Sequence, residues 1–210
     1  MERIFVYGAG GQGKVVIDAL RWSLPQLAVG VLVDDDARQH GKIVLCHRVE
    51  GPESVRSERG FVAIGDNASR LRIASHFSGR LVIVTHRSAV VGIDVEIGEG
   101  TILSAGSIVA PGARIGRNVI LNTAASVDHD CIIEDGVHIA PGSRLCGNVR
   151  VGRGTLLGAG TIVVPGVRIG SFAFVHAGQT ITSDVADGET VRAPRPRTGD
   201  RKRTADPVIP

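Results

Sequence analysis

Apolar and polar residues follow different patterns in the two parts of this chain. In residues 1–84, short apolar runs such as RIFVYG and AVGVLVDDD alternate with a segment of helical spacing, VVIDALRWSL. GFVAIGDN and GRLVIVTH indicate a third and a fourth strand, and residues 68–77 indicate a second helix. Because strands alternate with helices, we expect a parallel α/β domain whose ligands bind at the carboxyl ends of the strands.

From residue 89 the pattern repeats every six residues. Hexads counted from Ala89 run sixteen times without an insertion and end at Asp184. The third position of every hexad is aliphatic, and the sixth position is Gly in nine hexads and Asn or Asp in five. This period is typical of a parallel β-helix, in which each aliphatic side chain points inward and stacks on its equivalent in the next coil. Gly, Asn and Asp at the sixth position fit corners with left-handed backbone.

These patterns predict three parts. They are a Rossmann-like α/β domain at residues 1–84, an all-β parallel β-helix at residues 85–190, and a basic, Pro-rich tail at residues 191–210 that is expected to be flexible. The three cysteines form no C-x-x-C motif, the first residues show no signal-peptide pattern, and no apolar run is long enough to span a membrane. We therefore expect a soluble, cytoplasmic protein without a membrane span.

The net positive charge is confined to the tail. Residues 192–210 carry a net charge of +4 and the whole chain carries +3, which leaves −1 for the first 191 residues. A protein that binds nucleic acid presents its basic residues as a patch or stripe on a folded surface. We therefore expect no nucleic-acid partner.

The stretch GAGGQGK, residues 8–14, matches parts of two nucleotide-binding motifs. Gly8, Gly10 and Gly13 have the G-x-G-x-x-G spacing of dinucleotide-binding domains, which makes a nicotinamide oxidoreductase one alternative. The phosphate loop of nucleotide hydrolases requires Ser or Thr after the lysine, where this chain has Val15. The motif therefore indicates a helix N-terminus that binds a diphosphate, and leaves the nucleotide open.

His129 occupies an outward corner of its hexad, and Asp130 follows it directly. Imidazole titrates near neutral pH, and an adjacent carboxylate can fix its tautomer and raise its basicity, as a general base requires. With three hexads in each coil, the number implied by the family resemblance given below, equivalent positions lie 18 residues apart, and Gly147 and Pro111 flank His129 on the adjacent coils. His138 lies nine residues from His129, half a coil away, and faces the opposite side. If both histidines act in one reaction, the site lies between chains, and a closed trimer is the symmetric way to form it.

Zinc is the alternative use of these histidines, because some hexapeptide-repeat proteins are carbonic anhydrases. Those enzymes place three histidines around one metal ion, two of them five residues apart. The coil histidines of this chain lie 9 and 38 residues apart, and no H-x-x-x-x-H motif occurs. We therefore expect no metal.

The whole arrangement resembles the bacterial sugar O- and N-acyltransferases of the sialic-acid O-acetyltransferase type. The resemblance rests on YGAGGQG, VDDD, IGDN and THRSAVV, and above all on ILNTAASVDHDCIIEDGVHIAPGSRLCGNVRVG at residues 120–152. It extends from the N-terminus to about residue 190. It implies that the β-helix is left-handed, with three hexads per coil.

The resemblance also implies roles for individual residues. His129 would be the general base, and Asp130 would raise its basicity. His138 would contact the thioester of acetyl-CoA from a neighbouring subunit, and small residues would line the pantetheine channel. These small residues are Gly147, Ala159 and Ala177. The residues implied to bind the sugar nucleotide are Gly10, Gly11, Gln12, Asp34, Asp35, Gly65 and Asn67.

The function that these features favour is acetyl-CoA-dependent N-acetylation of the 4-amino group of a nucleotide-linked 4-amino-4,6-dideoxysugar by a homotrimer. O-acetylation of a sialic or related surface sugar needs the same machinery with a hydroxyl acceptor, and remains an alternative. A non-catalytic, trimeric nucleotide-binding scaffold is an alternative of a different class.

Overall fold

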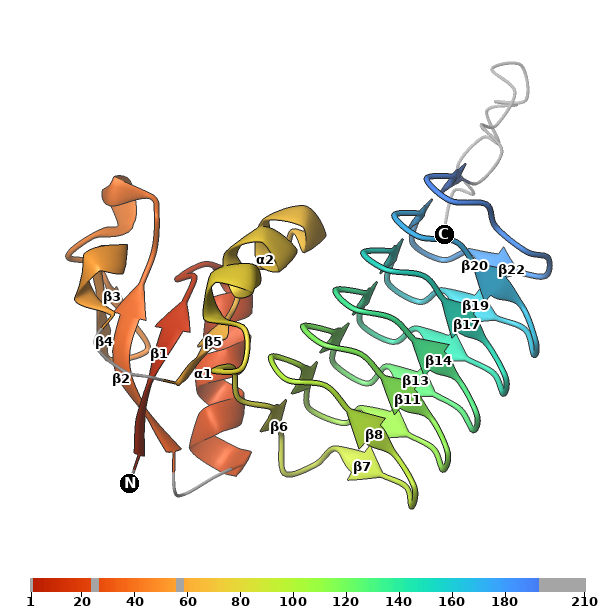
Figure 1. The fold of residues 1–210 in the computed structure, drawn as a ribbon, viewed down its shortest axis with the longest axis horizontal. Coiled ribbons are helices and arrows are strands. Elements are labelled where there is room, and N and C mark those ends of the chain that lie inside the picture. The colour runs from red at the N-terminus through yellow and green to blue at the C-terminus, as the bar shows by residue number, and fades with distance from the viewer. Residues whose placement is uncertain (1, 24–26, 56–58, 193–210) are drawn as a thin grey trace, which may run out of the picture.

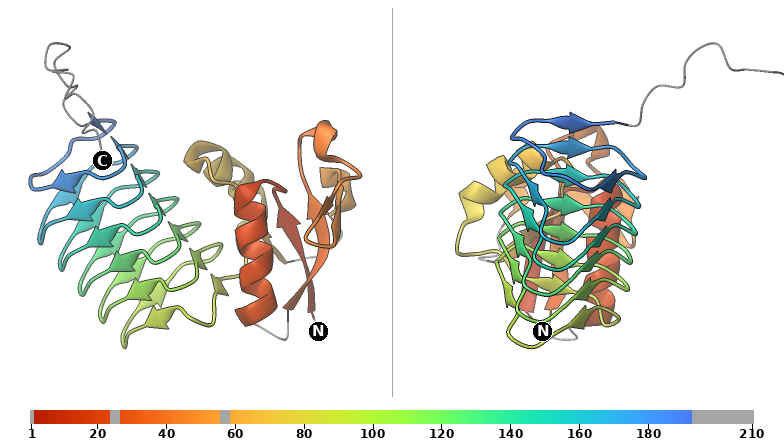
Figure 2. Two further views of the ribbon diagram at one scale, coloured as in Figure 1. Left: turned by 180° about the vertical axis from the view of Figure 1, so that it is seen from behind. Right: turned by 90° about the vertical axis from the view of Figure 1, so that its right-hand side faces the viewer.

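The computed structural model describes residues 2–23, 27–55 and 59–192, and the expected tail lies almost wholly outside them. Figure 1 shows an α/β domain beside a column of stacked coils. Helix α1, Gly11–Ser23, stands between the sheet of the α/β domain and the first coils in both figures (Figures 1 and 2). No helix among the described residues is long and apolar enough to cross a lipid bilayer.

The α/β domain contains one five-stranded sheet in the order β3-β4-β2-β1-β5. All its neighbouring strands pair in parallel except β3 and β4. The strands are β1 Glu2–Tyr7, β2 Leu27–Val33, β3 Ile43–Val44, β4 His47–Glu50 and β5 Gly60–Val62. Helix α2 spans Asn67–Ala74, and three short 3₁₀ helices cover Ala37–Gln39, Pro52–Ser54 and Ser75–Phe77.

Two details of this domain differ from the sequence-based expectation. The hairpin of β3 and β4 was not predicted, because its turn residues Leu45 and Cys46 adopt positive φ without the Asn or Gly that usually marks such a turn. The expectation of a fourth strand in this sheet is wrong. Leu81 makes only a single bridge to Gly60, and β6, Val84–Thr85, pairs with the β-helix instead.

The second part is a left-handed parallel β-helix built from three sheets. Sheet 1 contains β7 Val90–Val91, β10 Ile108–Val109, β13 Ser126–Val127, β16 Arg144–Leu145, β19 Ile162–Val163 and β22 Thr180–Ile181. Sheet 2 contains β8 Glu96–Ile97, β11 Arg114–Ile115, β14 Ile132–Ile133, β17 Arg150–Val151 and β20 Arg168–Ile169. Sheet 3 contains β6, β9 Ile102–Leu103, β12 Ile120–Leu121, β15 His138–Ile139, β18 Leu156–Leu157, β21 Phe174–Val175 and β23 Thr190–Val191.

The corners of the coils confirm the reading of the sixth hexad position. Positive φ occurs at this position in every hexad but the last, whether the residue is Gly, Asn, Asp, or the unexpected Ala124 and Phe172. Asp184 is the exception, and there the six-residue repeat also ends. The corner conformation is therefore imposed by the coil, because even residues that disfavour it adopt it.

The inward aliphatic side chains form a continuous core along the column. A second cluster joins the two parts of the chain: Ile102 and Ile120 project outward from sheet 3 and are buried together with α1 residues such as Val16 and Leu20. Burial of such side chains contributes about 1.5–3 kcal/mol each. The α/β domain therefore covers the N-terminal strands of sheet 3, including β9 and β12.

We expect substitutions at two stacked corners to change stability in opposite directions. Gly142 has a φ of +69° and open space where a Cβ would lie, and Ala124 below it has a φ of +54°. Gly142→Ala should destabilise the protein by about 1 kcal/mol, because left-handed backbone costs an L-residue about 1–2 kcal/mol and the stiffer unfolded chain offsets part of this. Ala124→Gly should stabilise it by a similar or smaller amount. Urea unfolding measures the free energy of unfolding of both variants. If both substitutions changed it in the same direction, this account of the corners would be contradicted.

Candidate active site

His129 lies on the exposed corner between sheets 1 and 2, two residues after the end of β13. Its Nδ1 contacts Asp130 Oδ2 at 2.8 Å, and its backbone N–H donates to Asp128 Oδ1 at 2.8 Å. Asp130 has a φ of +58°. Because the Asp130 carboxylate accepts a hydrogen bond from Nδ1–H, the proton of the neutral ring stays on Nδ1 and Nε2 carries the free lone pair. The hydrogen bond that His129 donates to Asp130 raises the pKa of His129, and the charges of Asp128 and Asp130 act in the same direction.

Gly147 lies opposite the His129 ring on the next coil. A Cβ at this position would lie 2.5 Å from His129 Nε2, so any other residue would displace the ring from this orientation. Among the described residues, no acceptor takes the Gly147 N–H. The corner therefore places a basic imidazole nitrogen and a free backbone donor side by side.

His138 lies on sheet 3, on the opposite side of the coil from His129, as the half-coil spacing predicts. Asn122 Oδ1 accepts from the Thr123 N–H, so Asn122 Nδ2 donates to His138 Nε2 at 3.1 Å. Burial lowers the pKa of His138 to about 4, and the nearby charge of Arg70 adds to this. His138 is therefore a neutral imidazole at physiological pH.

A cavity of about 530 Å³ lies at the carboxyl ends of β1, β2 and β5. It brings together six of the seven residues expected to bind the sugar nucleotide: Gly10, Gly11, Gln12, Asp34, Asp35 and Gly65. The N-terminus of α1 opens into it, so the unpaired backbone N–H groups there favour an anionic ligand.

The glycines at this cavity have two different reasons to be glycine. Gly8 has a φ of +112°, and a Cβ on Gly8 or Gly13 would overlap neighbouring backbone, so both are required by the fold. A Cβ on Gly10 or Gly11 would meet nothing within 4 Å. No contact of the described residues explains these two glycines, whereas a ligand seated on the helix N-terminus would occupy that space.

Several known proteins are similar to this chain in sequence and fold. Residues 3–77 match the PglD N-terminal domain. The acetyltransferase domain of PglB from Neisseria gonorrhoeae is 34% identical, with a TM-score of 0.81 over 90% of this chain and 96% of that chain. PerB from Caulobacter crescentus, solved in complex with CoA and GDP-perosamine, is 36% identical, with a TM-score of 0.82 over 90% of this chain and 93% of that chain. WeeI from Acinetobacter baumannii is 25% identical, with a TM-score of 0.63 over 90% of this chain and 95% of that chain.

The chain belongs to the bacterial sugar acyltransferase family. It is therefore an enzyme, a sugar acetyltransferase, and neither the non-catalytic scaffold nor the nicotinamide oxidoreductase describes it. Among the described residues of this acyltransferase, no three His, Cys, Asp or Glu side chains are grouped as a metal ion would need.

The two aspartates at the cavity of the acyltransferase have different environments. Asp34 accepts hydrogen bonds from the backbone N–H of Ala9 at 2.7 Å and of Asp36 at 2.9 Å, so its carboxylate ties the glycine loop to the end of β2. Asp35 accepts from the hydroxyl of Tyr7, and burial together with this bond raises the pKa of Tyr7. Among the described residues, both carboxylate oxygens of Asp34 accept hydrogen bonds from backbone N–H groups, whereas in Asp35 only Oδ1 accepts one, from the Tyr7 hydroxyl. Asp35 therefore has more acceptor capacity left for a ligand.

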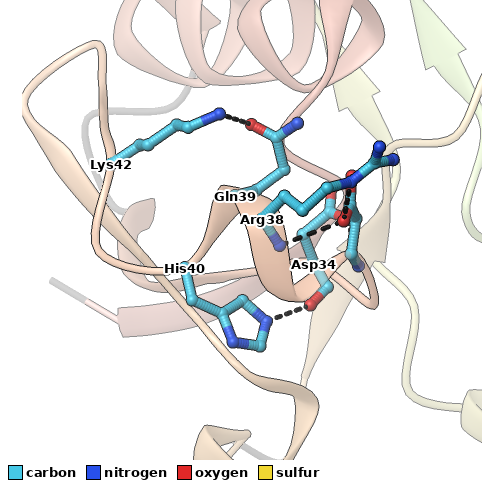
Figure 3. Close-up of polar contacts among 6 residues, drawn as sticks. Asp34, Arg38, Gln39, His40 and Lys42 are labelled. Atoms are coloured by element: carbon cyan, nitrogen blue, oxygen red, sulfur yellow. Dashed lines mark hydrogen bonds and ion pairs between the residues drawn. The ribbon is translucent and has the colours of Figure 1, made fainter.

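Local contacts hold the loop that carries these aspartates. In Figure 3, the ring of His40 points to the backbone carbonyl of Asp34, to which its Nε2 donates at 2.8 Å. Lys42 reaches Gln39 Oε1 at 3.2 Å, and Arg38 pairs with Asp36 at 2.9 Å. The rim of the cavity after β2 is therefore fixed by its own side chains.

Asn67 does not line the cavity, contrary to the expectation for a substrate-binding residue. It is buried, and its Nδ2 donates to the carbonyls of Gly154 at 2.9 Å and Thr155 at 3.0 Å in the β-helix. Asp66 is the N-cap of α2, which makes Asn67 the first helical residue and turns its side chain toward the coil.

The residues expected to bind CoA lie in two separate places. Gly147 shares the corner of His129 between sheets 1 and 2, whereas Ala159 and Ala177 lie on the corner between sheets 3 and 1. His138 lies on sheet 3, next to that second corner. One protomer therefore holds two half-sites that do not meet.

Tyr7, Ser69 and Arg72 are among the cavity residues that the sequence did not reveal. Tyr7 is the last residue of β1, so its position directly before Gly8 could have indicated it. Ser69 and Arg72 are one helical turn apart on α2, and only the packing of this helix shows that they face the cavity.

Asp130→Asn should lower the pKa of His129, because the carboxylate hydrogen bond is the largest cause of its elevation. An NMR titration of the His129 ring nitrogens measures this. His138 is the internal reference, since its pKa of about 4 keeps its resonances unchanged between about pH 6 and pH 8. An unaltered His129 titration in the variant would refute the role of Asp130.

Proposed function

We propose that this acyltransferase transfers the acetyl group of acetyl-CoA to the 4-amino group of a nucleotide-linked 4-amino-4,6-dideoxysugar, with His129 as general base. The observation that carries the proposal is the His129 corner, where Asp130 directs the free Nε2 outward and the Gly147 N–H lies beside it. PerB, which is similar over 90% of the chain, was solved with CoA and GDP-perosamine.

The corner supports each demand of acetyl transfer to an amine. His129 Nε2 can accept the proton that the attacking amine loses, and Asp130 stabilises the resulting imidazolium. The Gly147 N–H can donate to the thioester oxygen as negative charge develops there. Acetyl-CoA supplies the activated acyl group: its C–S bond breaks as the amide forms, and CoA leaves as the thiol after taking the proton from the His129 imidazolium.

The cavity of the α/β domain supports a nucleotide-linked acceptor. Gly10 and Gly11 leave open space at the N-terminus of α1, where a diphosphate is stabilised by backbone N–H groups and the helix dipole. Asp35 retains acceptor capacity for ribose or base donors. The loop therefore binds the nucleotide part of the acceptor, and the chemistry takes place at His129.

A homotrimer would complete the site. Sheet 1 presents three exposed aliphatic side chains and one arginine, namely Val90, Ile108, Ile162 and Arg144. Sheet 2 presents three arginines, Arg114, Arg150 and Arg168, and the α/β domain covers the N-terminal strands of sheet 3. Sheet 1 is therefore the face best suited to pack around a three-fold axis. Its two flanking corners then meet corners of the neighbouring protomers, which brings the His129 corner of one chain to the His138 half-site and cavity of the next.

Activity assays with His129→Gln test the proposal. The protein is incubated with acetyl-CoA and a panel of UDP-, GDP- and dTDP-linked 4-amino sugars, and release of free thiol is followed. His129→Gln should lower kcat by about 10²–10⁴-fold, because general base catalysis contributes that much. In the wild type kcat/KM should rise with pH as His129 loses its proton, and Asp130→Asn should move this rise to lower pH. Full activity of His129→Gln would refute the mechanism.

Gly11→Asp and Gly11→Asn test the diphosphate site as a matched pair. Both side chains enter the same open space at the start of α1, so the fold tolerates them equally. Gly11→Asp should raise the KM for the sugar nucleotide about tenfold more than Gly11→Asn, because only the carboxylate repels the diphosphate. The KM for acetyl-CoA should stay unchanged in both.

Mixing the two variants, and assaying them at a sugar-nucleotide concentration well below the KM of Gly11→Asp, then tests the shared site. Refolding His129→Gln with Gly11→Asp at equal amounts should restore roughly a quarter of the wild-type sites, because each site would take His129 from one protomer and the cavity from the next. If verified mixed trimers showed no recovered activity, both half-sites of a working enzyme would belong to one chain, and the shared site would be refuted.

A further inference from the structure

Arg70, on α2, is buried where the α/β domain meets the β-helix. Its side chain is fully excluded from solvent, and it donates five hydrogen bonds of 2.7–3.1 Å. No carboxylate among the described residues lies within salt-bridge distance of it, and burial lowers the pKa of Arg70 to about 10. A buried cation held only by neutral acceptors requires nearly all of its donors to be satisfied.

On one side, Arg70 binds corners of the β-helix. Its Nε donates to the carbonyl of Asn118 at 2.9 Å, and Nη2 donates to the carbonyl of Gly136 at 2.7 Å. These corners are equivalent positions on successive coils, 18 residues apart. Asn67, whose Oδ1 accepts from Arg70 Nη2 at 2.8 Å, binds Gly154 on the third coil. The Asn67–Arg70 pair therefore spans three successive coils.

On the other side, Arg70 binds the wall of the nucleotide cavity. Its Nη1 donates to the carbonyl of Ile64 at 2.9 Å and to that of Gly65 at 3.1 Å. Both residues line the cavity, in the loop between β5 and α2. His138 begins β15 two residues after Gly136, so the strand that carries it starts beside the corner that Arg70 binds. One guanidinium thus connects the cavity wall, the coil corners and the surroundings of His138.

We propose that Arg70, together with Asn67, is a positioning residue that sets the location of the acceptor cavity along the β-helix. Corners repeat along the column at each coil, so they provide similar docking points at different heights. Two donors of Arg70 and the amide of Asn67 fit one set of three corners, and Arg70 Nη1 fixes the loop Ile64–Gly65 to it. The proposal rests on the proposed function, in which a nucleotide held in this cavity presents its amine to a distant histidine.

The experiment compares two acceptors in Arg70→Lys and Asn67→Asp. Lys keeps the charge but cannot reproduce the planar set of five donors. Asp keeps the acceptor for Arg70 but loses the donors to the Gly154 and Thr155 carbonyls. One acceptor is the nucleotide-linked 4-amino sugar, and the other is the methyl glycoside of the same amino sugar. Ala68→Gln, at an exposed position of the same helix, is the control and should behave as the wild type.

Both variants should lower kcat/KM for the nucleotide-linked acceptor by about 10–100-fold, because misplacement by about 1 Å can cost that much. The methyl glycoside does not use the cavity, so its kcat/KM and the KM for acetyl-CoA should change less than about twofold. A purely structural role would reduce the amount of active enzyme and would therefore lower kcat/KM for both acceptors equally. That result would overturn the proposal. Circular dichroism and the Tm verify folding.

Calorimetric titration with UDP, GDP and dTDP separates this proposal from the proposed function. If the wild type transfers acetyl groups to none of the acceptors, the proposed function fails. Arg70→Lys should still weaken binding of the nucleoside diphosphate that the wild type binds, by about tenfold, because the cavity wall is no longer held. Unchanged affinity in Arg70→Lys would overturn the positioning role.

Discussion

The stacking of equivalent residues 18 apart is the constraint on which the rest of the structure depends. Each strand of the β-helix is only two residues long, so no strand is stable without its neighbours above and below. The inward aliphatic side chains and the parallel hydrogen bonds repeat at every coil, and together they hold the corners in left-handed backbone. This regularity explains why Ala124 and Phe172 adopt the same conformation as the glycines at equivalent positions.

A rigid corner is a good place for a catalytic base. His129 is exposed, but its backbone, its Asp130 partner and the facing Gly147 all belong to the repeating frame. The ring is therefore oriented without being buried, and its pKa rises where the pKa of the buried His138 falls. The same geometry separates the two histidines by half a coil, which is why a complete site requires a second protomer in the proposed mechanism.

The α/β domain is joined to this frame in two chemically different ways. Ile102 and Ile120 are buried with α1 in a nonspecific apolar contact that fixes the domain against sheet 3. Arg70 and Asn67 form directional hydrogen bonds to particular coil corners. Apolar burial tolerates sliding between similar surfaces, whereas a fixed set of donors and acceptors does not. The apolar contact therefore stabilises the interface, and the hydrogen bonds fix the position of the domain along the coils.

The sequence by itself determined the β-helix, because a six-residue period with inward aliphatic residues leaves no other arrangement that buries them. It also located the His129–Asp130 pair and most of the cavity, since these residues lie next to each other or at the ends of parallel strands. Tertiary structure alone decided the positions of Asn67 and Arg70, the unpredicted hairpin, and the transfer of β6 from the α/β sheet to the β-helix. Each of these depends on contacts between residues far apart in the chain, such as Arg70 with Gly136, and a local pattern carries no record of which distant carbonyl a side chain will meet.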